Sequence, residues 1–341
     1  MSGDAPMRID LSRVMIIARK EFADHLTDRT FLLVLALFGI LTVLALHDGL
    51  ASYASSLQWY ALQLEQMKTA IPSSIPPNYS PPHLPSTIYI LLAPGENFLL
   101  FGPVLAIAVG FDLIAGERTA RSLRMLLVRP VFRDEVITGK AVGGAAVLAL
   151  ASAVPFILAL GAMLAAGFTV TPYAAVMVAL FWGATVLYLL AYFAVAVAFS
   201  GFAEDGGRAL AWAMAVFILF STVVPAAAGY AAGLAAGPLS EPLPEDVLPE
   251  EMQNYLEEQS RYYGTYNGVR NAVLAFSPNS NYETMYETVM EVLVDYHGED
   301  AVTHAPGELL DRLWQNVVAL VAFPAIFLAV AYVRFMRIDL R

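Results

Sequence analysis

The sequence predicts an all-α integral membrane protein with six transmembrane helices, an N-terminal interfacial helix, a short cytoplasmic helix and a small outer helical module. Hydrophobic residues make up 58% of the 341 residues, and charged residues make up only 14%, against about 25% in ordinary soluble domains. Six nearly charge-free windows match or approach the roughly 20 apolar residues that one membrane-spanning helix needs. These windows are 30–49, 97–115, 139–166, 172–200, 208–232 and 313–333.

The distribution of basic residues predicts the orientation of the chain, because Lys and Arg concentrate on the cytoplasmic side of membrane proteins. Fifteen of the nineteen Lys and Arg residues fall on one predicted side, in the segments 1–29, 116–140, 201–208 and 334–341. We therefore expect both termini in the cytoplasm, in agreement with an even number of spans. The net charge of −11 comes from the opposite side, where acidic loops are expected to be solvated. The expected environment is a lipid membrane, with no nucleic acid as a partner.

The N-terminal segment 1–29 is predicted to contain a basic amphipathic helix. Its apolar face consists of Leu11, Val14, Met15, Ala18, Phe22 and Leu26. Such a helix directly before a span is expected to lie on the inner membrane surface. The alternative is a cytosolic helix that packs on protein.

The segments between spans differ in character. The outer segment 50–96 begins as a helix and then carries six prolines between positions 71 and 85, which predicts an extended strap. The outer segment 233–312 is too long for a simple connection and is predicted to form a helical extracytoplasmic module. The domain organisation is therefore 1–29, 30–232 with spans one to five, 233–312, and 313–341 with the sixth span and the tail.

Gly229, Gly233 and Gly237 repeat at every fourth position near the end of the fifth span. Small residues at this spacing allow two membrane helices to approach closely. The repeat predicts helix packing, either between two subunits or within one chain, and the sequence does not separate the two.

The segment 116–130, between the second and third spans, is predicted to form a short helix on the membrane surface. Leucines supply an apolar face, arginines lie opposite, and Pro130 ends the helix. A topological role alone, in which arginines hold this loop inside, would not require the Glu117-Arg118 pair or the proline at these positions.

Sequence motifs for catalysis and metal binding are missing. The stretch 133–141 contains Gly139-Lys140, but Asp134 and Ala141 replace residues that a phosphate-binding loop requires. The chain has no cysteine, and His297 and His304 lie in an acidic loop where surface exposure is more common than metal binding. We expect no catalytic residue, metal or cofactor in this chain.

The segment 117–140 resembles the coupling region of type-2 ATP-binding-cassette (ABC) transporter permeases. The matching residues are Glu117, Arg118, Ser122, Leu123, Leu126, Leu127, Pro130, Arg133 and Lys140. Two residues depart from the family pattern, since Arg121 replaces a glycine and Ser122 replaces a threonine. The residues Arg19, Lys20, Glu21 and Phe22 resemble the interfacial elbow helix of the family, and the stretch 276–282 resembles its Ser-Pro stretch before the last span.

The resemblance implies a permease subunit of an exporter, in the plasma membrane of a prokaryote, that forms a homodimer. A separate ABC ATPase subunit would bind ATP and Mg, and the coupling helix would contact it. The residues assigned to coupling are Glu117, Arg118, Arg121, Ser122, Leu123, Leu126, Pro130 and Arg133. Glu117 is expected to help dock the ATPase. A secondary transporter and a non-transporting accessory subunit are the alternatives.

Overall fold

The computed structural model describes residues 10–69, 88–119, 132–239, 249–294 and 306–337, and these are helical without any strand. Six helical segments are long and apolar enough to cross a membrane, which confirms the predicted fold class. The elements are α1 (Leu11–Thr27), α2 (Arg29–Thr69), α3 (Ile88–Gly110), α4 (Ala115–Thr119), α6 (Arg133–Ala165), α7 (Pro172–Phe202), α8 (Gly206–Ile218), the π-helix η2 (Leu219–Val223), α9 (Val224–Ala236), α10 (Pro249–Leu274), α11 (Pro278–Val294) and α12 (Pro306–Met336).

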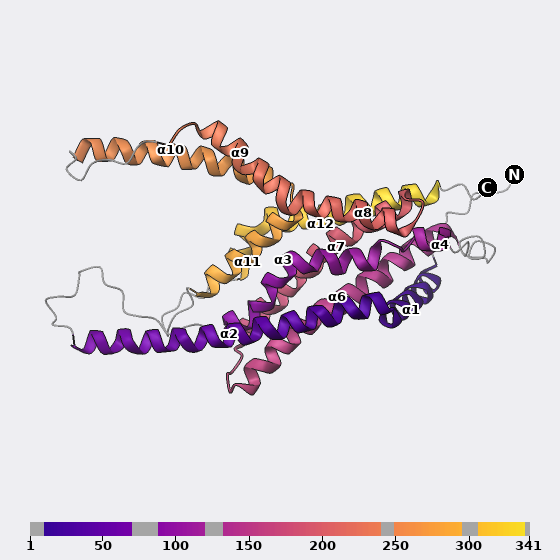
Figure 1. Cartoon of the computed structure of the whole chain (residues 1–341), viewed down its shortest axis with the longest axis horizontal. Coiled ribbons are helices and arrows are strands. Elements are labelled where there is room, and N and C mark those ends of the chain that lie inside the picture. Colours follow the sequence, from indigo (N-terminus) through magenta and orange to yellow (C-terminus); the bar gives the residue numbers. More distant parts are fainter. Residues whose placement is uncertain (1–9, 70–87, 120–131, 240–248, 295–305, 338–341) are drawn as a thin grey trace.

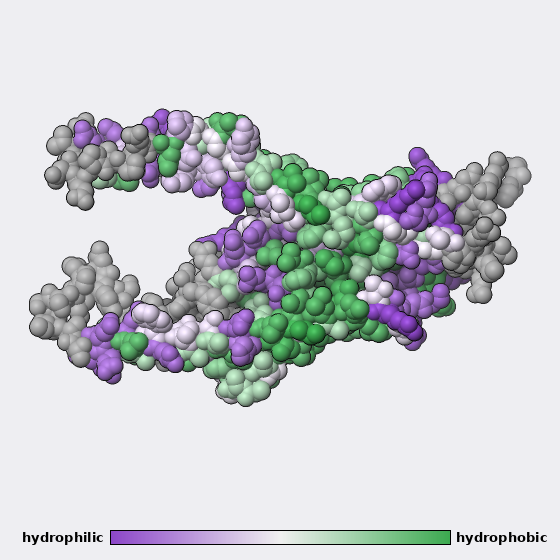
Figure 2. Space-filling view, in the orientation of Figure 1, coloured by the Kyte–Doolittle hydropathy of each residue, from purple (hydrophilic) through white to green (hydrophobic). Residues whose placement is uncertain are grey.

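The bundle has two distinct ends (Figure 1). At one end lie α1, α4, the turn between α7 and α8 and the last turn of α12, and we call this the basic end. At the other end α2 and the α9–α10 pair project from the bundle as two arms, and we call this the arm end. Figure 2 shows hydrophobic side chains over the middle of the bundle and hydrophilic ones on the arms and at the basic end. This belt is the surface that a bilayer would cover.

Helix α7 forms the centre of the bundle. It packs against α3, α6 and α12, and its residues from Leu189 to Val197 are almost all buried. A helix that is apolar all round is stable only when other helices surround it. The other spans therefore pack around α7.

Helix α2 is longer than the predicted span 30–49. Its 41 residues extend about 60 Å at 1.5 Å per residue, twice the roughly 30 Å core of a bilayer. The predicted strap 50–96 is thus helical at both ends, as part of α2 and as the start of α3, and its proline-rich centre lies outside the described residues. The arm of α2 is a direct continuation of the first span.

A proline inside α3 creates a binding site for α11. Pro103 has no N–H, so it cannot bond the carbonyl of Leu99 four residues earlier. That carbonyl accepts hydrogen bonds from the hydroxyl of Tyr188 at 3.0 Å and from the side-chain amide of Asn279 at 3.3 Å. The Asn279 side chain also accepts a hydrogen bond from Tyr192. The first turn of α11 is thereby joined to α3 and α7.

The stretch 276–282 packs against η2 and α7 within the bundle. Ser277 donates to the carbonyl of Phe220 in η2 at 2.9 Å. The ring of Tyr282 stacks on Tyr188 with 4.4 Å between centroids, and its hydroxyl lies 3.0 Å from that of Thr185. Helix α11 starts inside the bundle, where carbonyls and hydroxyls satisfy its polar groups. The domain boundary at 233 stays a prediction.

We predict that Asn279→Leu lowers the free energy of unfolding by about 1–3 kcal/mol, because it leaves the buried Tyr192 hydroxyl without its acceptor. Equilibrium unfolding in mixed micelles measures this change. The matched control is Asn267→Leu on α10, whose side chain is exposed. Equal stability of the two variants would contradict the role given to Asn279.

Candidate functional site

The ammonium group of Lys140 lies between two carboxylates at the basic end. Its Nζ atom is 2.8 Å from Oε2 of Glu21 and 2.9 Å from Oε1 of Glu117. The three side chains are largely buried, and they come from α6, α1 and α4. Removing one partner of a buried ion pair costs about 3–5 kcal/mol, because it leaves an uncompensated charge. This triad therefore ties three elements together.

Glycines bring α1 close enough to α6 for the triad to form. A Cβ atom on Gly139 would lie 2.7 Å from Cβ of Ile17, and one on Gly143 would lie 2.7 Å from Cβ of Glu21. Real Cβ atoms do not approach so closely, so α1 rests directly on the backbone of α6. Ala18 and Glu21 lie on the buried face of α1. Glu21 is thus aimed at Lys140 by the same face that packs on the glycines.

A second buried carboxylate joins the starts of α1 and α6. Glu135 accepts a hydrogen bond from the backbone N–H of Phe132 at 3.1 Å, which caps α6, and one from the N–H of Asp10 at 3.2 Å. The guanidinium of Arg13 lies 3.8 Å from the same carboxylate. Helix α1 is therefore fixed to α6 both at its start and at Glu21.

Arg118 attaches α4 to the end of α7. Its guanidinium donates to the carbonyls of Ala203 at 3.0 Å and Gly201 at 3.2 Å. These carbonyls lie at the C-terminus of α7, where a positive charge interacts favourably with the helix dipole. The hydroxyl of Ser200 also accepts hydrogen bonds from two backbone N–H groups at the start of α4. The neighbours Glu117 and Arg118 thus bind different helices.

A cavity of about 400 Å³ lies beside the triad. Its wall includes Asp24, His25, Asp28 and Asp112, together with the triad itself. Burial lowers the pKa of His25 from its ordinary value of 6.5, and the nearby Glu21, 3.8 Å away, opposes this effect. His25 is therefore neutral at neutral pH, although acidic groups surround it.

The structure describes three of the predicted coupling residues. Glu117 and Arg118 join other helices as described, and Arg133 donates to the carbonyl of Met336 at the end of α12 at 3.3 Å. The remaining predicted coupling residues lie outside the described residues. They are Arg121, Ser122, Leu123, Leu126 and Pro130.

The elbow residues divide between the surface and the bundle. Arg19 and Lys20 are exposed, and Lys20 pairs with Asp24 at 3.4 Å on the surface. Phe22 packs against the core, and Glu21 enters the triad. The structure thus separates residues of α1 that face outward from those that bind α6.

The predicted glycine repeat has a different local structure from the one expected. Gly237 ends α9 with a positive φ of 78°, and its predicted role in helix packing stays a prediction. An added Cβ on Gly233 would meet nothing within 4 Å, and one on Gly229 would meet only the Tyr266 hydroxyl at 3.8 Å. A role of Gly229 and Gly233 in a subunit interface stays a prediction.

Sequence reasoning missed the partners of Glu117 and the close approach of α1. Two signals in the sequence point to them. Lys140 lies within an apolar window, where a charge needs a partner. Gly139 and Gly143 have the same four-residue spacing as the repeat that begins at Gly229.

This chain is similar to known membrane transport proteins. The family described as "ABC-2 family transporter protein" matches residues 15–340. The protein named "Probable ABC transporter permease protein NosY" of Pseudomonas aeruginosa is 28% identical over 212 residues, which is 61% of this chain and 66% of that protein. Its namesake in Stutzerimonas stutzeri is 31% identical over 146 residues, 43% of this chain and 44% of that protein. The chain thus matches less than two thirds of the length of either relative.

We predict that Gly143→Ala lowers the free energy of unfolding by about 1–3 kcal/mol, because the added methyl group pushes α1 away from α6. Gly161→Ala on the same helix is the control, since its Cβ would meet nothing within 4 Å and alanine favours helices. Thermal unfolding of the two purified variants measures the difference. A Gly143 variant as stable as the Gly161 variant would contradict the close packing.

We predict that His25 makes the protein less stable in mild acid. The unfolded chain binds a proton below about pH 6.5 while folded His25 resists it, so the free energy of unfolding falls as the pH drops below this value. Glu21, Asp24, Asp28 and Lys140 act on this group. The unfolding temperature should therefore fall less on acidification in His25→Gln than in the unmodified chain. An identical fall in both proteins would exclude His25 as the cause.

Proposed function

The chain belongs to the ABC-2 family of transporter proteins, and from this premise we propose that it is the permease subunit of an ATP-driven exporter. A separate ATPase subunit supplies the energy, and it acts on the segment 116–130. The observation that carries this proposal is the attachment of Glu117 to α6 and of Arg118 to the end of α7, both at the start of that segment.

The environment of Lys140 supports a separate ATPase. A phosphate-binding lysine must present its ammonium to a nucleotide at the end of a glycine-rich loop. Here Gly139 and Lys140 lie inside α6, and the ammonium is held by Glu21 and Glu117. The Gly-Lys pair is therefore used for packing and ion pairing within the membrane subunit.

The contacts at the basic end suggest how ATPase movement reaches the spans. A displacement of the segment 116–130 pulls on Glu117, which is tied through Lys140 to α6 and α1, and on Arg118, which is tied to the end of α7. The movement is thereby shared by four helices instead of bending α3 alone. Coupling between sites requires such an element, with two arrangements that both sites favour differently.

A second copy of the permease chain is part of the proposal. The span formed by α8, η2 and α9 is largely uncovered within one chain, and only 17% of its most apolar window is buried. The neighbouring hydroxyls of Ser221 and Thr222 in η2, 3.5 Å apart, lie on this span, where polar groups in hydrocarbon are costly. The open surface at Gly233 lies on the same helix. These features support a homodimer with this span at the interface.

We predict that Glu117→Gln lowers the ATP turnover of the reconstituted permease–ATPase complex about fivefold or more, as expected from coupling energies of about 1–3 kcal/mol. Because the Glu117 carboxylate faces Lys140 within the chain, recovery of the complex should be unchanged. Glu204→Gln removes a carboxylate that is exposed at the same end and serves as the control. Loss of recovery with normal turnover per complex would assign Glu117 to docking, and full turnover with full recovery would remove it from the coupling path.

We predict that the basic end faces the cytoplasm, because it carries the excess of basic residues. The chain has no cysteine, so single cysteines report accessibility directly. An impermeant thiol reagent added to intact cells should label Ser56→Cys on the arm of α2 and should not label Thr119→Cys in α4 until the cells are opened. Both positions are exposed in the structure. The reverse pattern would overturn the orientation.

A further inference from the structure

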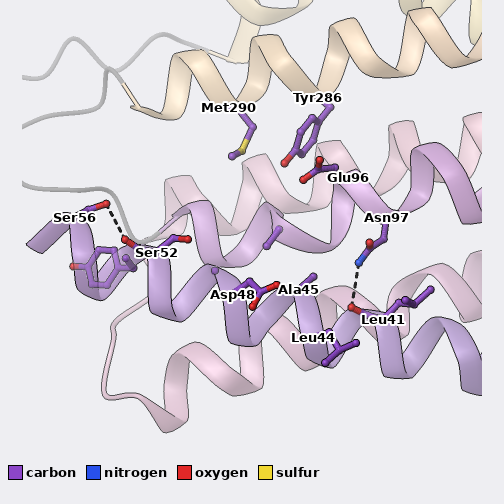
Figure 3. Close-up of a pocket in the computed structure, with 13 residues that line it drawn as sticks. Leu41, Leu44, Ala45, Asp48, Ser52, Ser56, Glu96, Asn97, Tyr286 and Met290 are labelled. Carbon is purple, nitrogen blue, oxygen red and sulfur yellow. Dashed lines mark hydrogen bonds between the residues drawn. The ribbon is translucent and has the colours of Figure 1, made fainter.

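A cavity of about 680 Å³ lies between α2, α3 and α11 at the arm end. Figure 3 shows its lining side chains converging from these three helices. The apolar part includes Leu41, Leu44, Ala45, Ala93 and Met290. The polar part includes Asp48, Ser52, Tyr53, Ser56, Glu96, Asn97 and Tyr286. The cavity thus combines a hydrocarbon-like wall with a polar one.

The length of α2 indicates where the cavity lies relative to the bilayer. The stretch from Arg29 to Asp48 is about 28 Å of helix, close to the roughly 30 Å thickness of a bilayer core. Leu41 lies two turns deeper, toward the basic end. The carboxylates of Asp48 and Glu96, both exposed, are therefore at the height of lipid headgroups, while the apolar wall is at the height of the chains.

The charged side chains that line the cavity are all acidic among the described residues. Asp48 and Glu96 carry two negative charges, and no lysine, arginine or histidine is among the described residues that line the cavity. A phosphate or carboxylate group would be repelled here, and a positively charged group would be attracted. The rings of Tyr53 and Tyr286 add aromatic surface, which favours ammonium groups.

Hydrogen bonds fix the width of the cavity. Asn97 of α3 donates to the carbonyl of Leu41 in α2 at 3.3 Å (Figure 3). On the opposite side, Tyr282 of α11 donates to the carbonyl of Gly95 in α3 at 3.3 Å, and Tyr286 and Met290 follow one and two turns later on α11. The three walls are therefore held in place before any ligand binds, which lowers the entropic cost of binding.

From this shape, depth and charge we infer that the cavity between α2, α3 and α11 binds a cationic amphiphile, a molecule with an amine or quaternary ammonium head and an alkyl tail. The head lies at Asp48 and Glu96, and the tail lies along Leu41, Leu44 and Met290. A lipid whose head also carries a phosphate fits less well, since no basic side chain among the described lining residues receives that group. This inference does not depend on transport, because the permease chain alone contains the cavity.

The test uses dodecyltrimethylammonium as the probe and the chain reconstituted in nanodiscs of phosphatidylcholine. A single cysteine at Ser56, at the mouth of the cavity, carries an environment-sensitive fluorophore. We expect a saturable response to the cationic probe, and a response at least about tenfold weaker in affinity to dodecyl maltoside, which has the same tail and no charge. Equal affinity for both compounds would overturn the inference.

Substitution of the two carboxylates tests the proposed contacts. In Asp48→Asn with Glu96→Gln, both exposed and isosteric changes, the apparent Kd for dodecyltrimethylammonium should rise about tenfold or more. Glu65→Gln removes one charge from the same helix beyond the cavity and should leave this Kd unchanged. Unchanged affinity in the double variant, with the thermal unfolding of all variants alike, would overturn the inference. A saturable response to calcium chloride alone, with none to the amphiphile, would make this a metal site and would equally overturn it.

Discussion

The arrangement of the basic end depends on the ion pairs that the buried ammonium of Lys140 makes with Glu21 and Glu117. A charge within a membrane-spanning helix needs a partner of opposite sign, and Lys140 has two, from α1 and α4. Neither carboxylate is close to Lys140 in sequence, so satisfying this charge requires both elements to pack on α6. The glycines at 139 and 143 make the packing sterically possible. The ion pairs of Lys140 and the close backbone contact at the glycines therefore both favour the packing of α1 on α6.

Helix α3 connects this end of the bundle to the other. At its basic end it leads into α4, where Glu117 binds α6 and Arg118 binds the end of α7. Near its middle, the carbonyl that Pro103 leaves free binds Asn279 at the start of α11. A shift of α3 therefore carries α11 with it, and α11 forms one wall of the cavity that also contains Asp48 and Glu96. In the proposed transporter, movement at the basic end would therefore reach the cavity at the arm end through α3.

The sequence predicts the six spans and the helical α1 because both depend on local composition and periodicity. It does not predict the contacts of the stretch 276–282, because hydropathy alone assigns Ser277, Asn279 and Asn281 to water. In the structure these side chains donate to backbone carbonyls inside the bundle, and Asn281 also accepts a hydrogen bond from Asn316. The contact between Glu21 and Lys140 joins residues 119 positions apart, and no local pattern encodes such a pair. The resemblance pointed to Glu117 and Arg118 and led to an expected ATPase contact for Glu117, but it did not predict which residues of the same chain the two side chains bind.

We expect α1 and α6 to move as one unit when the proposed ATPase acts, because Lys140 and the glycines hold them together. Spin labels at Lys20→Cys on α1 and Val142→Cys on α6, both exposed positions, report the distance between the two helices in the assembled complex. Dilution with unlabelled permease removes contributions from a second copy. We expect one narrow distance distribution that is the same without nucleotide and with trapped ATP. A distribution that shifts or broadens when ATP is trapped would show that α1 moves independently of α6 and that the contacts of Lys140 do not hold the two helices together.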